Sequence, residues 1–398
     1  MKKIILRLGL CLSVLFITGC WDRKELNEQA IWIGSGWDVA KNGGIEVSGQ
    51  IVIPSNIQTQ GGGGGTMQKG FFTISAIGKN LTDALQNIQT KLPRQALAGQ
   101  RRVMIFGEPF ARRGIKRELD NNQRRAEVNL RTDVFVIKGA TAKKALSVSN
   151  PLEKPPITAP LGEHEQSGGR GNTAYLDLLM AATSDGLRPS IPVLEFSSTQ
   201  GGKRKDKESA NPPLLRIAGV AIFDKNLKMQ GILNMEEYRD VLWVMGIQKF
   251  LAIGVKKEDV NASLTVDKLS SKIEPHISKN QQITFTITLK GDGSLKENNS
   301  GLDVRNPKNL KQLEKEFEKT SQKQVQQMVT KVQKEYGLDI FGLGEVIHRK
   351  NPNKWKLLKH DWDKKFSEAT ILVKTDLRIK EIGMDGPSLL YKESEIKR

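Results

Sequence analysis

The stretch that decides the fold of the second half of the chain runs from Pro307 to Tyr336, with the sequence PKNLKQLEKEFEKTSQKQVQQMVTKVQKEY. Its apolar residues largely follow the spacing of one helical face, and Lys, Glu and Gln surround them. Gly337 follows directly and ends the pattern. The stretch therefore predicts one long amphipathic helix, whose apolar stripe consists of Leu310, Leu313, Phe317, Val325, Met328, Val332 and Tyr336.

Strand patterns with one apolar face flank this helix. Apolar and polar residues alternate in Thr370 to Ile379, and the same alternation marks Ser263 to Val266 and Ile283 to Leu289. A coiled coil with a partner chain is an alternative use of the helix, but Thr320 and Gln324 interrupt its stripe. We therefore expect an α+β fold class in which the long helix packs on an antiparallel sheet of the same chain.

The segment from Ser197 to Pro213 separates this half from the first. It contains Gly201-Gly202, a charged run from Lys203 to Glu208 and the pair Pro212-Pro213, a composition that buries little surface. We interpret the segment as a linker. The elements predicted directly after it are a hairpin, 216–223 with 228–233, and a helix over 236–245.

Strands alternate with helices in the first half, which is typical of a mixed α/β layer. The half opens with a hairpin in which Trp32 to Val39 and Ile45 to Ile53 flank an Asn-Gly turn. Asn80 is placed to cap a helix that Pro93 ends. Prolines between residues 151 and 192 predict extended connections on the surface. The other predicted elements are strands over 71–77, 102–106 and 133–137 and helices over 109–119, 140–148 and 174–182.

The first nineteen residues have the order of an export signal: a basic start, an apolar run from Leu8 to Ile17, and Thr18-Gly19 before Cys20. The apolar run is about half as long as a membrane-spanning helix. Ile17 to Cys20 also fits the lipobox of bacterial lipoproteins. We therefore predict cleavage before Cys20, with diacylglycerol on its sulfur and an acyl chain on its amino group. The alternative is a soluble secreted protein in which Cys20 is incidental.

Removal of the signal changes both the thiol content and the charge of the chain. Cys11 lies inside the removed segment, so Cys20 is the only thiol of the mature chain and no intramolecular disulfide is possible. The loss of three basic residues lowers the formal net charge from +18 to +15. Export argues against a nucleic-acid partner, whereas anionic lipid headgroups, acidic wall polymers and plain solubility stay open as explanations of the charge.

No residue pattern predicts a catalytic, metal or cofactor site. The four histidines are far apart in the chain, and His164, between two glutamates, is expected in a polar loop. Gly61 to Gly65 lacks the Lys-Ser/Thr of a phosphate loop and predicts a surface loop instead. Trp355 and Trp362 are expected to anchor the core, with contact to a membrane or partner as the alternative. An enzymatic role is therefore not supported.

The residues after the lipobox carry a family resemblance. The string Gly19-Cys20-Trp21-Asp22-Arg23-Lys24-Glu25-Leu26-Asn27 closely resembles the Ger(x)C family, the lipoprotein C subunits of spore germinant receptors. Three further blocks match the family pattern and extend the resemblance over nearly the full length. They are Arg101 to Glu108 with Ala111 to Ile115, then Gly219 to Phe223, then Gly337 to Gly344, where Leu343 stands in place of a common Phe.

The resemblance implies a multi-domain chain of three mixed α/β domains and a role without catalysis. Its implied partners are integral A and B subunits and membrane lipid, on the outer face of the spore inner membrane. Cys20 is the one residue whose chemical role is carried over, and direct binding of a small molecule stays open. The predicted division is a signal peptide over 1–19, an N-terminal domain over 20–196, the linker 197–213, a middle region over 214–300 and a C-terminal domain over 301–398.

Two other functions stay open beside this lipid-anchored receptor subunit for nutrient-triggered germination. An extracytoplasmic solute-binding lipoprotein would capture a small nutrient directly, but such proteins usually have two α/β lobes, whereas the second half here predicts hairpins and one long helix. A wall-acting hydrolase would need a catalytic constellation that the sequence does not display.

Overall fold

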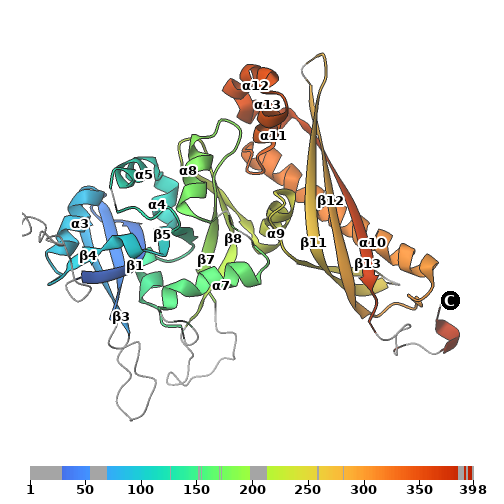
Figure 1. Cartoon of the computed structure of the whole chain (residues 1–398), viewed down its shortest axis with the longest axis horizontal. Helices are drawn as coiled ribbons and strands as arrows, with labels where there is room; N and C mark the ends of the chain where they lie inside the picture. The colour runs from blue at the N-terminus through green and yellow to red at the C-terminus, as the bar shows by residue number, and fades with distance from the viewer. Residues whose placement is uncertain are drawn as a thin grey trace, which may run out of the picture.

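The computed structural model describes residues 29–53, 70–125, 127–150, 153, 155–169, 171, 173–197, 213–257, 260–280, 282–383, 390 and 393–396. Cys20, the Gly61 to Gly65 stretch and residues 198–212 of the predicted linker lie outside this part of the chain. Two β-sheets organise the described residues, one built from strands between residues 29 and 234 and the other from strands between residues 251 and 381 (Figure 1).

The first sheet has nine strands in the order β3-β2-β1-β5-β6-β7-β8-β9, with β4 beside β1. Strands β1, β5, β6 and β7 run parallel, and antiparallel pairs extend the sheet on both sides. Parallel neighbours need crossover connections, which the intervening helices supply. The strands are β1 (Gln29–Val39), β2 (Ile45–Val52), β3 (Phe71–Gly78), β4 (Gln95–Leu97), β5 (Val103–Gly107), β6 (Asp133–Ile137), β7 (Ser190–Phe196), β8 (Leu215–Phe223) and β9 (Met229–Asn234).

Helices cover both faces of this sheet because its central strands are apolar on both sides. In β5, Val103 and Ile105 belong to one hydrophobic cluster, whereas Met104 and Phe106 belong to the other. The elements around the sheet are α3 (Leu81–Gln89), η2 (Ala98–Gln100), α4 (Glu108–Arg113), α5 (Lys116–Gln123), α6 (Ala142–Ser147), η3 (Pro156–Thr158), α7 (Ala159–Gln166) and α8 (Tyr175–Thr183).

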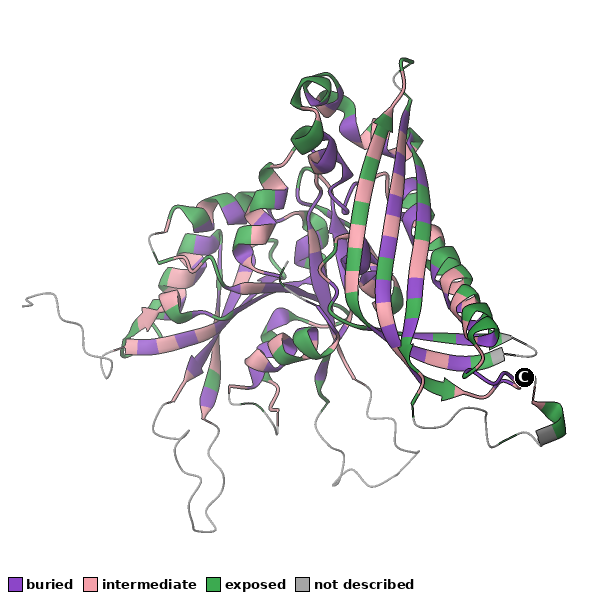
Figure 2. Ribbon diagram, turned by 45° about the vertical axis from the view of Figure 1, so that its right-hand side comes forward, coloured by how far each residue is buried: buried purple, intermediate pink, exposed green. Residues whose placement is uncertain are grey.

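The second sheet has the order β10-β11-β12-β13, and α10 packs along it (Figure 1). Buried and less buried residues alternate along its long strands, as Figure 2 shows. Strand β13 runs parallel to β12 rather than antiparallel, and the long crossover that this requires contains the four α-helices α10 to α13. The elements are α9 (Met235–Val244), β10 (Leu251–Lys257), β11 (Val260–Ile277), β12 (Ile283–Asn298), α10 (Pro307–Lys331), η4 (Val332–Tyr336), α11 (Leu343–Lys350), α12 (Pro352–Leu358), η5 (Lys359–Asp361), α13 (Trp362–Glu368), β13 (Thr370–Glu381) and η6 (Glu393–Glu395).

The long helix packed on a sheet of its own chain is confirmed. In α10, Leu313, Phe317, Val325 and Met328 are buried. Polar side chains of the helix also form hydrogen bonds with backbone groups at the outer edge of β13. The Gln326 side chain donates to the Ile371 carbonyl at 3.0 Å and accepts from the Val373 N–H at 2.9 Å. Helix and sheet are therefore joined by apolar packing and by edge hydrogen bonds, which protect β13 from pairing with another strand.

Local signals in the first half are confirmed as well. Strands β1 and β2 pair in antiparallel register across the predicted turn. The Asn80 side chain accepts the Asp83 N–H at 3.0 Å and caps α3. The predicted helix over 109–119 is instead two helices, α4 and α5. Gly114 separates them with φ of +109°, a conformation that interrupts helical hydrogen bonding.

The proline-rich part of the first half differs from the prediction, because it contains regular elements. Pro160 lies in the first turn of α7, where a missing N–H breaks no helical hydrogen bond. Pro192 lies inside β7, and β6 pairs with β7 only at Val193 and Leu194, beyond the proline. Sheet pairing with β8 therefore incorporates this segment despite its composition.

Sheet pairing crosses two of the predicted domain boundaries. Strands β8 and β9, which follow the linker, belong to the first sheet. Strand β12 precedes residue 300, and its neighbour β13 follows it. The ranges 20–196, 214–300 and 301–398 stay a prediction as a division into domains, whereas the sheets divide the described residues between β9 and β10.

Candidate functional site at the junction of the two sheets

The Gly337 to Gly344 block folds around one buried carboxylate. Asp339 is fully buried, and its oxygens accept the backbone N–H groups of residues 341, 342, 343 and 344 at 2.8 to 3.1 Å. The Trp362 indole N–H donates a fifth hydrogen bond at 3.0 Å. Burial raises the pKa of the Asp339 carboxyl to about 6, although hydrogen bonds from Gly344, Leu343, Trp362 and Phe341 favour its charged form. The carboxylate thus fixes the start of α11 and ties it to α13.

The loop between α8 and β7 contacts this block from the first sheet. The Arg188 N–H donates to the Asp339 carbonyl at 2.7 Å, and the Arg188 side chain forms an ion pair with Asp363 at 2.9 Å between Nε and Oδ1. Because the Arg188 side chain is only 8% exposed, solvent screens this pair less than a surface pair. Ser184 adds a hydrogen bond to Glu345 at 2.6 Å. One short loop therefore links the first sheet to α11 and α13.

Two glycines allow the backbones to touch at this junction. A Cβ on Gly186 would lie 2.7 Å from the Gly344 carbonyl carbon, and a Cβ on Gly344 would lie 2.6 Å from the Gly186 Cα. Real Cβ contacts are not this short, so any side chain at either position would push the loop and α11 apart. Gly344 is therefore required by long-range packing, whereas Gly337 and Gly342 of the same block have positive φ and are required by local turns.

Gly186→Ala is expected to lower the free energy of unfolding by about 1 to 3 kcal/mol, because the added methyl overpacks the junction. Urea denaturation followed by tryptophan fluorescence measures this change. Gly162→Ala in α7 is the matched control, since a Cβ there meets no atom within 4 Å and replaces glycine inside a helix. Equal stability of the two variants would contradict the close approach of Gly186 and Gly344.

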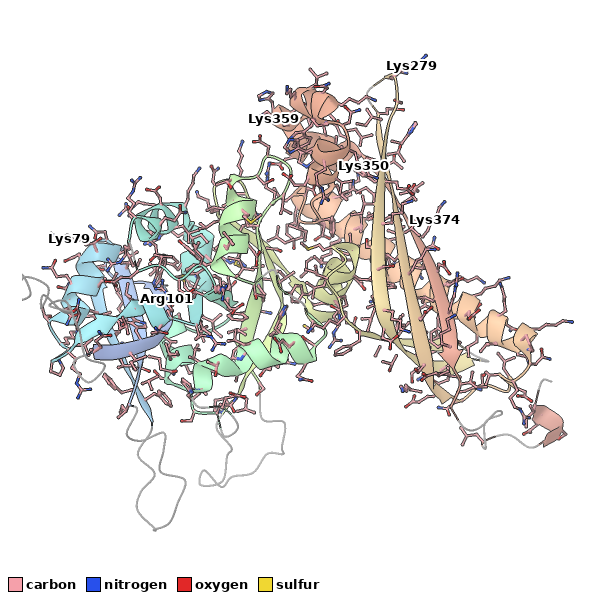
Figure 3. The ribbon with its side chains drawn as sticks, in the orientation of Figure 1. Lys79, Arg101, Lys279, Lys350, Lys359 and Lys374 are labelled. Atoms are coloured by element: carbon pink, nitrogen blue, oxygen red, sulfur yellow. The ribbon has the colours of Figure 1, made fainter. Side chains whose placement is uncertain are left out.

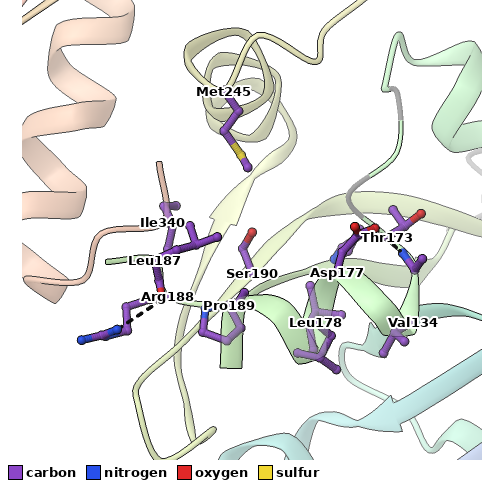
Figure 4. A pocket seen from close by; sticks show the side chains of 14 residues that line it. Val134, Thr173, Asp177, Leu178, Leu187, Arg188, Pro189, Ser190, Met245 and Ile340 are labelled. Atoms are coloured by element: carbon purple, nitrogen blue, oxygen red, sulfur yellow. Dashed lines mark hydrogen bonds between the residues drawn. The ribbon is translucent and has the colours of Figure 1, made fainter. Parts of the chain in front are cut away.

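Figure 4 shows the small cavity beside this junction, with Arg188, Pro189, Met245 and Ile340 among its labelled residues. Its volume is about 10 Å³, which is room for about one water molecule. The junction therefore acts as a contact between the two sheets, and a ligand the size of a nutrient does not fit in it.

The other two matched blocks serve the architecture of the first sheet. Gly107, in the Arg101 to Glu108 block, lies against the Asp38 carboxylate and leaves no room for a side chain. Asp38 accepts the N–H groups of Ala142 at 2.9 Å and Lys143 at 3.0 Å, and so holds the start of α6. Burial raises the pKa of Asp38. The Gly219 to Phe223 block lies within β8.

The histidine and tryptophan predictions have different outcomes. His164 lies buried in α7 and not in a polar loop, because its ring stacks on Tyr238 of α9 with 6.2 Å between centroids. Burial lowers the pKa of His164. Trp355 and Trp362 are 3% and 1% exposed and meet edge to face with centroids 5.2 Å apart, so their core role is confirmed.

Within the described ranges, no group of three His, Cys, Asp or Glu side chains converges as a metal site. No helix in that part of the chain is long and apolar enough to cross a membrane. Cys20, the predicted lipidation residue, lies outside the described residues. The sequence reasoning missed Arg188 and the role of Asp339. An acidic residue three positions before the Gly-Leu-Gly at the start of α11 is the signal that indicates a capping role.

Comparisons with known proteins match both halves of the chain. The family model for the spore germination protein N-terminal domain matches residues 22–196, and the model described as spore germination B3/GerAC like, C-terminal, matches residues 218–383. Spore germination protein KC of Bacillus subtilis (strain 168) is 26% identical, over 96% of this chain and 97% of that protein. The putative spore germination protein YfkR of the same organism is 28% identical, over 98% and 99%. The crystal structure of the GerBC protein has the same fold, with a TM-score of 0.56 at 20% identity over 87% of this chain and 97% of that one.

Proposed function

Because the chain belongs to the Ger(x)C family of spore germination proteins, we propose that it is the lipid-anchored, non-enzymatic C subunit of a spore germinant receptor. In this role it acts with integral membrane A and B subunits when a nutrient triggers germination, on the outer face of the spore inner membrane. The observation that carries the proposal is the pair of family models, which together extend from just after Cys20 almost to the end of the chain.

The N-terminal sequence supports the anchoring part of the proposal. Eight residues separate Cys20 from Gln29, where β1 begins. A fully extended segment of that length spans at most about 30 Å. An acylated Cys20 would therefore hold the first sheet close to the membrane surface and keep the chain within reach of integral membrane subunits.

The distribution of basic residues fits a position beside an anionic surface. Lysines lie exposed on both halves of the molecule, from Lys79 after β3 to Lys350 and Lys374 in the second half and Lys279 at the end of the β11–β12 hairpin (Figure 3). Each basic residue near an anionic membrane contributes on the order of 1 kcal/mol of attraction. Dispersed charge of this kind attracts the protein to an anionic membrane in no fixed orientation. The acyl chains on Cys20 would then provide the stable attachment.

Affinity purification of a tagged chain from detergent-solubilised spore membranes is expected to recover A-type and B-type subunits in comparable amounts. Mass spectrometry of the eluate measures this recovery. An unrelated lipoprotein that carries the same tag in the same spores is the control, since it shares the anchor and not the protein surface. Recovery of the chain alone, also after chemical cross-linking in intact spores, would contradict the receptor role.

A further inference from the structure

We propose that the cavity between α9, α10 and β10 binds a small organic molecule that carries an ammonium group next to a hydrogen-bond acceptor, a class that includes zwitterionic α-amino acids. The inference goes beyond the receptor-subunit role and does not depend on it. The cavity lies where α9, which follows the first sheet, meets the helix and edge strand of the second. Its volume is about 270 Å³, against about 10 Å³ for the cavity beside the junction of the two sheets.

Asp240 supplies the negative charge of the cavity. It lies on α9 and is 1% exposed. Within the described residues its carboxylate accepts hydrogen bonds from Gln324 alone, at 3.1 and 3.3 Å. A buried carboxylate with one neutral partner is costly, and a cation in the cavity would offset that cost. Asp240 is therefore the group that we expect to receive the ammonium.

The charged groups around Asp240 leave it without a cation of its own. Glu236 and Arg239 of α9 also line the cavity. After burial, repulsion from Glu236 and Glu237 is a further cause that raises the pKa of Asp240. Lys331 of α10 pairs with Glu237 at 2.7 Å. The part of β10 that lines the cavity, residues 251–254, contributes no titratable side chain. Burial is the largest cause that raises the pKa of Asp240, to about 7.

Two buried donors in the cavity wall have no partner. Trp243 Nε1 and Ser321 Oγ make no hydrogen bond in the described structure, although the residues are 1% and 4% exposed. Trp243 lies one turn after Asp240 on α9, and Ser321 lies one turn before Gln324 on α10, so each helix presents two polar groups on one side. Donors buried without a partner are destabilising. An acceptor beside the ammonium, such as a carboxylate or hydroxyl, would satisfy them.

The sequence of α10 places Ser321, one turn before Gln324, within the apolar stripe of the helix. Between Phe317 and Val325 the stripe has no apolar residue, and Ser321 occupies the gap as a buried residue. A hydrophobic residue at position 321 would complete the stripe and fill part of the cavity. Gln324, which interrupts the stripe and so argues against a coiled coil, also lines the cavity.

The edge strand leaves the remaining wall open. Ala252 and Gly254 are two residues apart on β10, so their side-chain positions lie on one face of the strand. Both line the cavity and both are exposed. A Cβ on Gly254 would meet no atom within 4 Å. Leu251 and Ile253, which also line the cavity, lie on the opposite, buried face of the strand, so a side chain at position 254 would point away from that buried face.

The chemistry of the lining favours an organic ammonium over other ligands. Calcium and magnesium need six or more oxygen ligands at short distances, and Asp240 is the one carboxylate of the lining that is buried. Arg239 and Glu236 also line the cavity but are not buried, so the buried charge that a ligand meets is the negative charge of Asp240, which repels an anion. An ammonium group offers three N–H donors to the carboxylate.

Calorimetric titration and thermal-shift measurements on the purified, detergent-solubilised chain test the proposal. The probes are the proteinogenic amino acids and ethanolamine, with L-lactate as the matched control for L-alanine because a hydroxyl replaces its ammonium group. We expect saturable binding of at least one ammonium probe and none of L-lactate. Equal binding of L-lactate, equal binding of potassium chloride, or no binding of any probe up to about 10 mM would overturn the proposal.

Variants locate the site once a probe binds. Asp240→Asn and Ser321→Leu are each expected to weaken binding by about tenfold or more, the first by removing the charge and the second by filling part of the cavity. Lys256→Leu, at an exposed position of β10 outside the lining, is the control and should bind as the native chain does. Asp240→Asn should keep the fold, because it removes a buried charge and retains the shape, and circular dichroism checks this. Native affinity in a folded Asp240→Asn or Ser321→Leu variant would overturn the assignment.

The pH dependence of binding gives a second readout. Because the pKa of Asp240 is about 7 and the ammonium binds its ionised form, affinity should rise about tenfold per pH unit below pH 7 and level off above it. This slope should disappear in Asp240→Asn. A slope that persists in the variant would show that another group controls binding and would contradict the role of Asp240.

Discussion

Replacement of Cys20 with Ala is expected to release the protein from the spore membrane and to weaken nutrient germination. Without the thiol no diacylglycerol is attached, and the acyl chains that would hold the mature chain are lost. One acyl chain gives only marginal binding, about 10⁴ M⁻¹, whereas two or more give stable anchoring. The uncleaved apolar run from Leu8 to Ile17 is about half the length of a membrane-spanning helix and is a weak substitute. Immunoblots of alkali-washed spore membranes should show a loss of roughly tenfold or more.

Cys11→Ala is the matched control for this experiment, because Cys11 lies in the predicted signal peptide and its loss should change neither retention nor germination. Cys20 is the only thiol expected in the mature chain, so its replacement disturbs no disulfide. Full membrane retention with normal germination in Cys20→Ala spores would contradict the anchor. Loss of retention with continued recovery of A and B subunits would separate anchoring from assembly.

Asp339→Ala is expected to lower the free energy of unfolding by about 3 to 5 kcal/mol. The substitution leaves four backbone N–H groups and the Trp362 indole N–H without their acceptor in a fully buried position. It also removes the group that fixes the start of α11, and through it the contact with Arg188. Urea denaturation followed by tryptophan fluorescence measures the loss, and Trp362 itself should report it through a changed environment.

Asp185→Ala is the matched control for Asp339→Ala. Asp185 belongs to the same junction and pairs with Lys359 at 3.0 Å, but its side chain is 57% exposed. An exposed pair of this kind contributes at most about 1 kcal/mol. If Asp339→Ala costs no more than Asp185→Ala, the five hydrogen bonds to Asp339 do not support the junction and its assigned role is wrong.

Some parts of this fold follow from short stretches of sequence. The Asn-Gly turn specifies the β1–β2 hairpin, because its backbone conformation is set by the turn residues themselves. Asn80 caps α3 with its own side chain, and the apolar stripe of α10 predicts the face that is buried. These signals act over one turn or a few residues, so a local reading of the sequence is sufficient to find them.

Other parts were not predictable, because their partners are remote in the chain. His164 looked like a loop residue from its neighbours, yet Tyr238 of α9 covers it in a buried helix. Pro192 argued against a strand, yet β7 forms because β8 pairs with it. Sheet pairing and burial compensate for unfavourable local composition, and neither is visible in a short window of sequence.

The candidate sites show the same division. The sequence by itself predicts the attachment point, because a lipobox such as Ile17 to Cys20 is a linear motif, and it indicates the family through blocks that include Gly337 to Gly344. Only the tertiary structure decided that Asp339 of that block meets Arg188 of the first sheet, and that Asp240 shares a cavity with Ser321. The physical reason is that close packing and the burial of a charge depend on segments far apart in the chain, and these meet only when both sheets have formed.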